Sequence, residues 1–195
     1  MERWSDGVME DLSLHILDIA ENSIDAGASR VEIRITVIVT DDRLTLTISD
    51  NGKGMDAETI EMVKDPFFST KPVRKKKFGL GIPLLAQAAE ECNGAFLIES
   101  HPGRGTVITA AFQNSHIDRK PLGDIGATMA VLIGGHPYMD FLLSCERDGF
   151  SYKLDTSELK KELQGVPVNL PDVLKLIKED INSALKGEIY NSGEA

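Results

Sequence analysis

Two runs of alternating apolar and polar residues, joined by a short acidic turn, constrain the fold of this chain most. The first run covers residues 31–40 and the second covers residues 43–50, with Asp41 and Asp42 between them. An apolar side chain at every second position is typical of a strand with one buried face. The sequence therefore predicts an antiparallel hairpin that is covered on one side.

A helix is predicted in front of this hairpin, over residues 9–26, and Gly27 is placed to end it. The apolar residues that recur at helical spacing are expected to form its buried face. They are Leu14, Leu17, Ala20 and Ile24.

The rest of the chain divides into a few short elements. Helices are expected over residues 56–64, 82–91, 156–164 and 171–186. Strands are expected over residues 95–100, 106–112, 128–133, 141–146 and 150–155. These elements suggest a first domain over 1–114, a polar linker over 115–124 and a small α+β extension of unknown role over 125–195. The hairpin of the extension is expected either to extend the first sheet or to form an edge for a homodimer.

Composition narrows the functional classes. The 195 residues include 21 Lys and Arg against 31 Asp and Glu, for a net charge of −10. Nucleic acids and anionic membranes are therefore not expected as partners. No apolar run approaches the roughly 20 residues of a membrane span, and the polar N-terminus is unlike a signal peptide, so a cytoplasmic location is expected. Cys92 and Cys145 lie far apart and are expected to be ordinary buried thiols.

The first predicted helix carries a polar stripe. His15, Asp18, Asn22 and Asp25 are spaced at i, i+3, i+7 and i+10, which places them within one narrow arc. Such a stripe, taken alone, is a solvated helix face.

Glycines follow the second strand of the hairpin. Asp50 is followed by Gly52 and Gly54, then by Met55. Glycine lets a backbone approach a ligand closely, and a carboxylate accepts hydrogen bonds from the exocyclic amine of a base. Turns use the same residues, so this pattern is weak by itself.

A long loop and two further glycine-rich segments complete the pattern. Residues 65–81 are rich in Pro, Gly and Lys and have no periodicity, which is typical of a functional or mobile loop. They end in Gly79, Leu80 and Gly81, where a helix begins and offers free N–H groups to phosphates. Residues 103–106 separate the last two strands of the first domain.

These blocks, in this order, resemble the GHKL ATPase superfamily of gyrases, heat-shock chaperones, histidine kinases and MutL, over residues 9–112. Residues 21–28 resemble its N box, 50–54 its G1 box, 66–71 the F box of histidine kinases and 79–81 its G2 box. The resemblance implies a Bergerat-type two-layer α/β sandwich, with a mixed, mainly antiparallel sheet and helices on one face. It also implies ATP and Mg²⁺ as cofactors.

The resemblance implies roles for individual residues. Asn22 is the implied Mg²⁺ ligand, and Asp50 the implied partner of the adenine amino group, supported by Thr106. Residues 65–81 are the implied ATP lid. The lysines at 75–77 within it fit a solvated loop as well as a phosphate contact. The nucleotide-binding residues so implied are Asn22, Asp25, Asp50, Gly52, Gly54, Met55, Phe68, Thr70, Lys71, Gly79, Leu80, Gly81 and Thr106.

Asp18 departs from the pattern of the hydrolytic members. Those families place a glutamate four residues before the metal-binding asparagine, and here that position holds Asp18. It is the candidate catalytic base, with a side chain one methylene shorter. A displacement of about 1 Å can cost ~10²-fold in rate, so ATP binding follows more directly from the resemblance than fast hydrolysis.

Two functions from different classes remain open. The first is a stand-alone protein kinase or ATPase module that acts on or regulates a protein partner. The second is a non-catalytic nucleotide switch whose lid gates partner binding. Residues 115–122 match a histidine-kinase phosphoacceptor pattern around His116 only in part, and a linker explains them more simply. The whole chain also resembles, loosely, small ATP-binding proteins encoded beside iron-only hydrogenase subunits.

Overall fold

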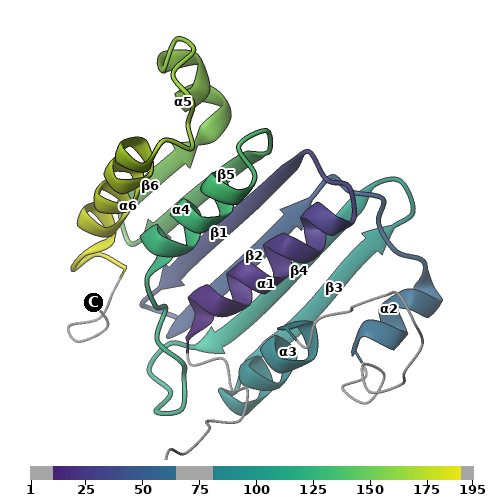
Figure 1. Ribbon diagram of the computed structural model, residues 1–195. Helices are drawn as coiled ribbons and strands as arrows, with labels where there is room; N and C mark the ends of the chain where they lie inside the picture. Colours follow the sequence, from purple (N-terminus) through teal and green to yellow (C-terminus); the bar gives the residue numbers. More distant parts are fainter. Residues whose placement is uncertain (1–10, 65–80, 190–195) are drawn as a thin grey trace, which may run out of the picture.

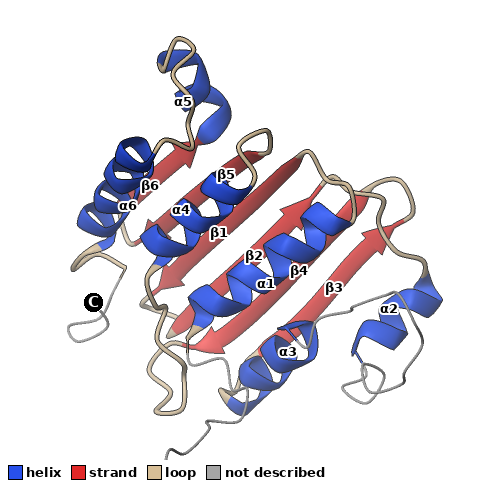
Figure 2. Cartoon of the chain, viewed as in Figure 1, coloured by secondary structure: helices blue, strands red, loops and turns tan. Residues whose placement is uncertain are grey.

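A computed structural model describes residues 11–64 and 81–189 of the chain, and its strands form a single six-stranded sheet (Figures 1 and 2). The strands are β1 (Arg30–Ile38), β2 (Arg43–Asp50), β3 (Ala95–His101), β4 (Gly105–Gln113), β5 (Asp140–Arg147) and β6 (Phe150–Asp155). Their order across the sheet is β3-β4-β2-β1-β5-β6. Only the β1–β5 pair is parallel among these strands, so the sheet is mixed and mainly antiparallel, as predicted.

Helices cover one face of this sheet. The helices of the described residues are α1 (Leu12–Asp25), α2 (Ala57–Lys64), α3 (Gly81–Glu91), α4 (Ile125–Gly135), α5 (Thr156–Glu162) and α6 (Pro171–Leu185). Figure 2 shows α1, α3, α4 and α6 side by side in front of the strands, with α2 beyond α3 at the β3 edge. The predicted two-layer α/β sandwich is therefore confirmed.

The central hairpin forms where the alternating pattern predicted it. In β1 every second side chain is buried, from Val31 to Val37, and β2 buries Leu44, Leu46 and Ile48 in the same way. The turn between the two strands places Asp42 at φ 48°, a conformation that Asp tolerates better than most residues. The core lies between this hairpin and the helix layer.

The buried face of α1 differs from the predicted one. The apolar side chains that it buries are Leu12, Ile16, Ile19 and Ala20, whereas Leu14 is 40% exposed and Leu17 and Ile24 are half-buried. Two apolar stripes run along this helix, and both have helical spacing. Periodicity alone could not show which stripe packs on the sheet.

The segment 128–133, predicted as a strand, is helical. It forms most of α4, which begins after Asp124, whose carboxylate accepts a hydrogen bond from the Ala127 amide at 2.7 Å. A short apolar run fits a buried strand and a buried helix equally well. The helix forms here because α4 packs against α1 and α6, where Gly126 approaches the backbone of Lys178 too closely for a Cβ.

The C-terminal hairpin extends the first sheet, which was one of the two predicted arrangements. β5 pairs in parallel with β1, with Ile33 opposite Leu143. The Arg30 guanidinium and the Asp155 carboxylate form a 3.1 Å ion pair across this junction. The division into a domain and an extension stays a prediction.

Two further expectations can be compared with the structure. Cys92 and Cys145 are both buried and free, as predicted. No helix within residues 11–64 and 81–189 combines the length and the apolar character needed to span a bilayer.

Candidate functional site

Several predicted site residues meet at one end of the sheet. β2 ends at Asp50, and its neighbour in β4 is Thr106, directly opposite in the antiparallel register. The C-terminal half of α1 lies over this end, so that Ser23 reaches Asp50. Strand register and one helix thus bring together residues from three separate parts of the chain.

The Asp50 carboxylate is held by two donors. Ser23 Oγ donates to Oδ2 at 2.9 Å, and the Gly52 amide donates to Oδ1 at 2.8 Å. Each carboxylate oxygen carries further acceptor capacity. The group is therefore fixed in orientation and still able to accept a hydrogen bond from a ligand amine.

The glycines around Asp50 are required by contacts within the protein. Gly54 has φ 65°, and a Cβ there would overlap the backbone carbonyl of His101. A Cβ on Gly105 would overlap the backbone carbonyl of Asp50. The loop after β2 therefore lies directly against the turn between β3 and β4, which fixes the wall of the site.

Ser100 links these two segments, although the sequence analysis did not single it out. Its hydroxyl accepts a hydrogen bond from the Met55 amide at 2.8 Å and donates to the Gly105 carbonyl at 2.9 Å. It also lies 2.9 Å from the Thr106 hydroxyl. Ser23 was missed as well, and its only signal was its position next to Asn22.

Asp18 and Asn22 form a second group on α1, nearer the start of α3. Asn22 Nδ2 donates to Asp18 Oδ2 at 3.2 Å. Burial raises the pKa of Asp18, while hydrogen bonds from Asn22 and from the Gly81 backbone act in the opposite direction. A Cβ on Gly81 would overlap the Asp18 carboxylate, so α3 begins directly against it.

The residues around Asn22 are compatible with a magnesium ion that binds together with a nucleotide, and not with a site made of protein ligands alone. The described residues contain no group of three or more His, Cys, Asp or Glu side chains that could hold a metal ion. Mg²⁺ is commonly bound by one or two protein oxygens together with substrate phosphates. Asn22 donates from its amide nitrogen to Asp18, and its carbonyl oxygen is of the chemical type that could bind such an ion.

The remaining predicted residues do not join these two groups. Asp25 is exposed at the end of α1. His15, predicted to lie on the polar stripe of the first helix, is fully buried instead. Outside the described residues lie Phe68, Thr70, Lys71, Gly79 and Leu80.

His116 is also described. It lies in a turn after β4, where its Nδ1 accepts a hydrogen bond from the Asp118 amide at 3.2 Å. No helix of the described residues carries this histidine.

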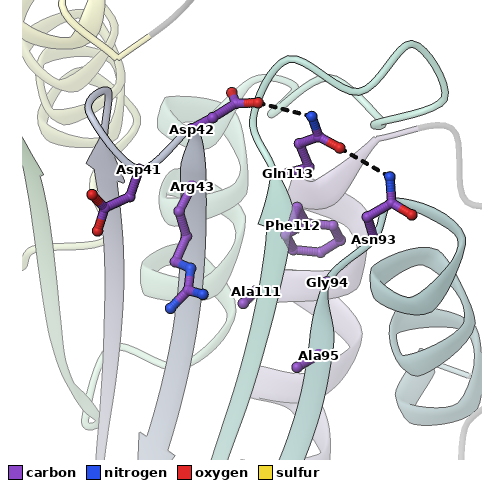
Figure 3. A pocket seen from close by; sticks show the side chains of 9 residues that line it. All are labelled: Asp41, Asp42, Arg43, Asn93, Gly94, Ala95, Ala111, Phe112 and Gln113. Atoms are coloured by element: carbon purple, nitrogen blue, oxygen red, sulfur yellow. Dashed lines mark hydrogen bonds between the residues drawn. The ribbon is translucent and has the colours of Figure 1, made fainter.

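A separate hollow lies at the other end of β2. It has a volume of about 350 Å³ and includes Arg43, Ala95 and Ala111 in its lining (Figure 3). Asn93 and Asp42 close its rim through hydrogen bonds to Gln113, each 2.9 Å long. The length of β2, roughly 24 Å at 3.4 Å per residue, separates this hollow from Asp50. It is therefore not part of the candidate site.

Comparison with known proteins identifies a family and several relatives. A family model described as histidine kinase-, DNA gyrase B- and HSP90-like ATPase matches residues 7–116. The sensor protein kinase FleS of Pseudomonas aeruginosa is 35% identical over 94 residues, which are 48% of this chain and 23% of FleS. Sporulation kinase C of Bacillus subtilis is 32% identical over 91 residues, which are 47% of this chain and 21% of that kinase. The chain thus spans less than a quarter of the length of these two relatives.

Among solved structures, the Aquifex aeolicus MutL ATPase domain complexed with ADP matches with a TM-score of 0.44 and 22% sequence identity. The match covers 80% of this chain and 68% of that one. The N-terminal domain of a DNA repair protein matches with a TM-score of 0.47 and 18% identity, over 76% of this chain and 52% of that one.

Proposed function

Because this chain belongs to the family of histidine kinase-, DNA gyrase B- and HSP90-like ATPases, we propose that it binds ATP together with Mg²⁺ and uses it to act on or regulate a protein partner. The observation that carries the proposal is the fixed Asp50 carboxylate, held by Ser23 and Gly52 with acceptor capacity to spare. Such a group recognises the exocyclic amine of adenine.

The phosphate side of the proposed site lies along α1. Ser23 lies five positions after Asp18, about 7.5 Å along the helix axis. Asp18 meets the N-terminus of α3 at Gly81, and a helix N-terminus favours anions. The base would therefore lie over Asp50, and the phosphates near Asn22 and Gly81.

Bound Mg·ATP supplies the transferable phosphoryl group and neutralises negative charge on the phosphates. Asn22 offers its carbonyl oxygen to the metal and its amide nitrogen to Asp18. Asp18 then accepts the proton of the attacking hydroxyl or water. Its burial raises its pKa, which makes it a stronger base than an exposed aspartate.

One observation favours the second function, a non-catalytic nucleotide switch. The Asp18 carboxylate is already engaged by Asn22 and by the Gly81 backbone, and its side chain is short. If these contacts keep the Asp18 carboxylate away from the attacking water, the protein would bind nucleotide without hydrolysing it. Nucleotide binding would then change only the contact with the partner.

The test is to incubate the purified protein with Mg²⁺ and γ-labelled ATP, and to follow free phosphate and label on protein. Free phosphate that disappears in Asp18→Asn supports an ATPase. Acid-labile label that is lost in His116→Ala supports a histidine kinase. ATP binding without either product favours the switch, and absence of ATP binding contradicts the proposal.

A further inference from the structure

The two edges of the sheet differ in what lies beside them. At one edge α2 lies next to β3 (Figure 2). At the other edge the backbone of β6 bonds only to β5, as far as the described residues show. An edge strand whose outer N–H and C=O groups are unpaired is a template for a further strand.

The turn before β6 determines which of its backbone groups point outward. Residues 148 and 149 have φ angles of 34° and 96°, which is typical of a two-residue type I′ turn. In such a turn the amide of the following residue, Phe150, faces the neighbouring strand. Bonded positions alternate along an antiparallel pair, so the backbone groups of Ser151 and Lys153 point away from β5. The side chains of these two residues are also exposed.

Apolar groups line the same edge on the side of the sheet that the helices cover. Phe150, Tyr152 and Leu154 pack against the core but are only half-buried. The Tyr152 hydroxyl donates to Asp180 Oδ2 on α6 at 2.7 Å. Leu176 lies one helical turn before Asp180, on the same face of α6, and is 65% exposed. The edge therefore offers apolar surface as well as unpaired backbone.

We propose that β6 pairs with β6 of a second copy of this chain, in an antiparallel register centred on Tyr152, so that one sheet runs through both copies. This register places Phe150 opposite the partner's Leu154. It also places Ser151 opposite the partner's Lys153, where the outward backbone groups of each can bond to those of the other. Twofold symmetry makes each of these contacts occur twice.

The side chains of β6 favour this register over its neighbours. Centring the pair on Lys153 would set two lysines directly opposite each other, and like charges in that position are destabilising. Centring it on Ser151 would leave Leu154 beyond the paired segment. In the register centred on Tyr152 each lysine faces a serine, and two tyrosine rings meet at the axis, where aromatic pairs stabilise a sheet. Leu176, on the side of α6 toward Tyr152, is then expected to be covered by the partner.

The first measurement is analytical ultracentrifugation of the full chain without nucleotide, over a wide range of protein concentration. A dimer that dissociates on dilution is expected. Ser151→Lys should raise the dissociation constant about tenfold at low salt, because it places two lysines opposite each other at two symmetric positions. Within one copy position 151 lies opposite Glu146 of β5, so the added lysine is not expected to destabilise the fold. Combining Ser151→Lys with Lys153→Glu should restore the wild-type dissociation constant within about threefold, since the introduced charges attract.

A second pair of variants tests the contribution of α6. Leu176→Ser should weaken the dimer, whereas Val131→Ser should not, because Val131 is a similarly exposed residue on α4, at 57%. Amide hydrogen exchange followed by NMR then locates the contact. The amides of Ser151 and Lys153 should exchange more slowly as the protein concentration rises, and the amide of Tyr152, which faces β5, should not change.

Three results overturn the inference. One is a monomer at every concentration. Another is a dissociation constant that Ser151→Lys leaves unchanged, because the copies would then associate through a different surface. The third is a double variant as weak as Ser151→Lys alone, which contradicts the register. If Ser151→Lys does not fold, Ser151→Pro replaces it, because an edge strand tolerates proline where its N–H faces solvent. None of these measurements needs ATP, so they do not depend on the proposed function.

Discussion

The carboxylate of Asp50, at the end of β2, accepts a 2.9 Å hydrogen bond from Ser23 Oγ on α1. This contact joins the sheet to the helix layer at the point where Asn22 and Asp18 follow along the same helix. Both halves of the candidate site therefore contact α1. The effect on ATP binding of a substitution at Asp50 can be compared with that of a substitution at Asn22.

Asp50→Asn is expected to weaken ATP binding about 10- to 100-fold. The change removes the charge and one acceptor oxygen, and a hydrogen bond to a charged group contributes about 1.5–3 kcal/mol. Calorimetric titration with ATP at constant Mg²⁺ measures the effect. Asp42→Asn is the matched control, because Asp42 is a hydrogen-bonded carboxylate beyond the opposite end of the same strand. Equal losses of affinity in the two variants would argue that Asp50 acts only through stability.

Asn22→Ala is expected to abolish the dependence of ATP affinity on Mg²⁺. The variant loses the oxygen that would bind the metal and the donor that orients Asp18. The ratio of the Kd for ATP in EDTA to that in Mg²⁺ should fall to about one. Gln87→Ala is the control, since Gln87 is an exposed amide on α3 that bonds only to Glu91 among the described residues. A ratio as high as that of the wild type would be incompatible with Asn22 as metal ligand.

His15 is expected to make the protein less stable as the pH falls from 6.5 to 4. Burial, and secondarily Lys120, lowers its pKa from 6.5 to about 4 in the folded state, so the unfolded chain binds more protons in this window. Stability from this group is complete above pH 6.5 and decreases by on the order of 3 kcal/mol toward pH 4.

Urea unfolding at pH 7.5, 6 and 5 tests this dependence. The difference in unfolding free energy between wild type and His15→Leu should change in favour of the leucine variant as the pH falls. Ile16→Val, another buried position on α1, should differ from wild type by the same amount at every pH. A constant difference for His15→Leu would show that the ring is not buried neutral.

Gly54→Ala is expected to be much more destabilising than Gly103→Ala. Both glycines have positive φ, at 65° and 76°, which costs roughly 1–2 kcal/mol for alanine. Only at Gly54 would the added Cβ overlap the carbonyl of His101, whereas nothing lies within 4 Å of a Cβ on Gly103. Denaturant unfolding should show a difference of at least about 2 kcal/mol between the variants. Equal losses of unfolding free energy in the two variants would mean that the loop after β2 can move away from His101 without an energetic cost.

Part of the site could be predicted from sequence because its signals are local. Asp18 and Asn22 are one helical turn apart, so any helix over residues 9–26 brings them together. Asp50 ends an alternating strand, and Gly27 ends α1 with φ 78°, as its position predicted. Ser100 could not be found in this way, because its role depends on Met55 and Thr106 from two other segments.

The sequence by itself determined the features that depend on local signals: the central hairpin from its alternating residues, the extent of α1 from its helical spacing, and the loop after β2 from its glycines. Only the tertiary structure decided which stripe of α1 is buried, that residues 128–133 form a helix, and that β5 lies beside β1. The burial of His15 was decided there too. The reason is physical: backbone periodicity depends on near neighbours in the chain, whereas the choice between two apolar faces depends on the surface that packs against them.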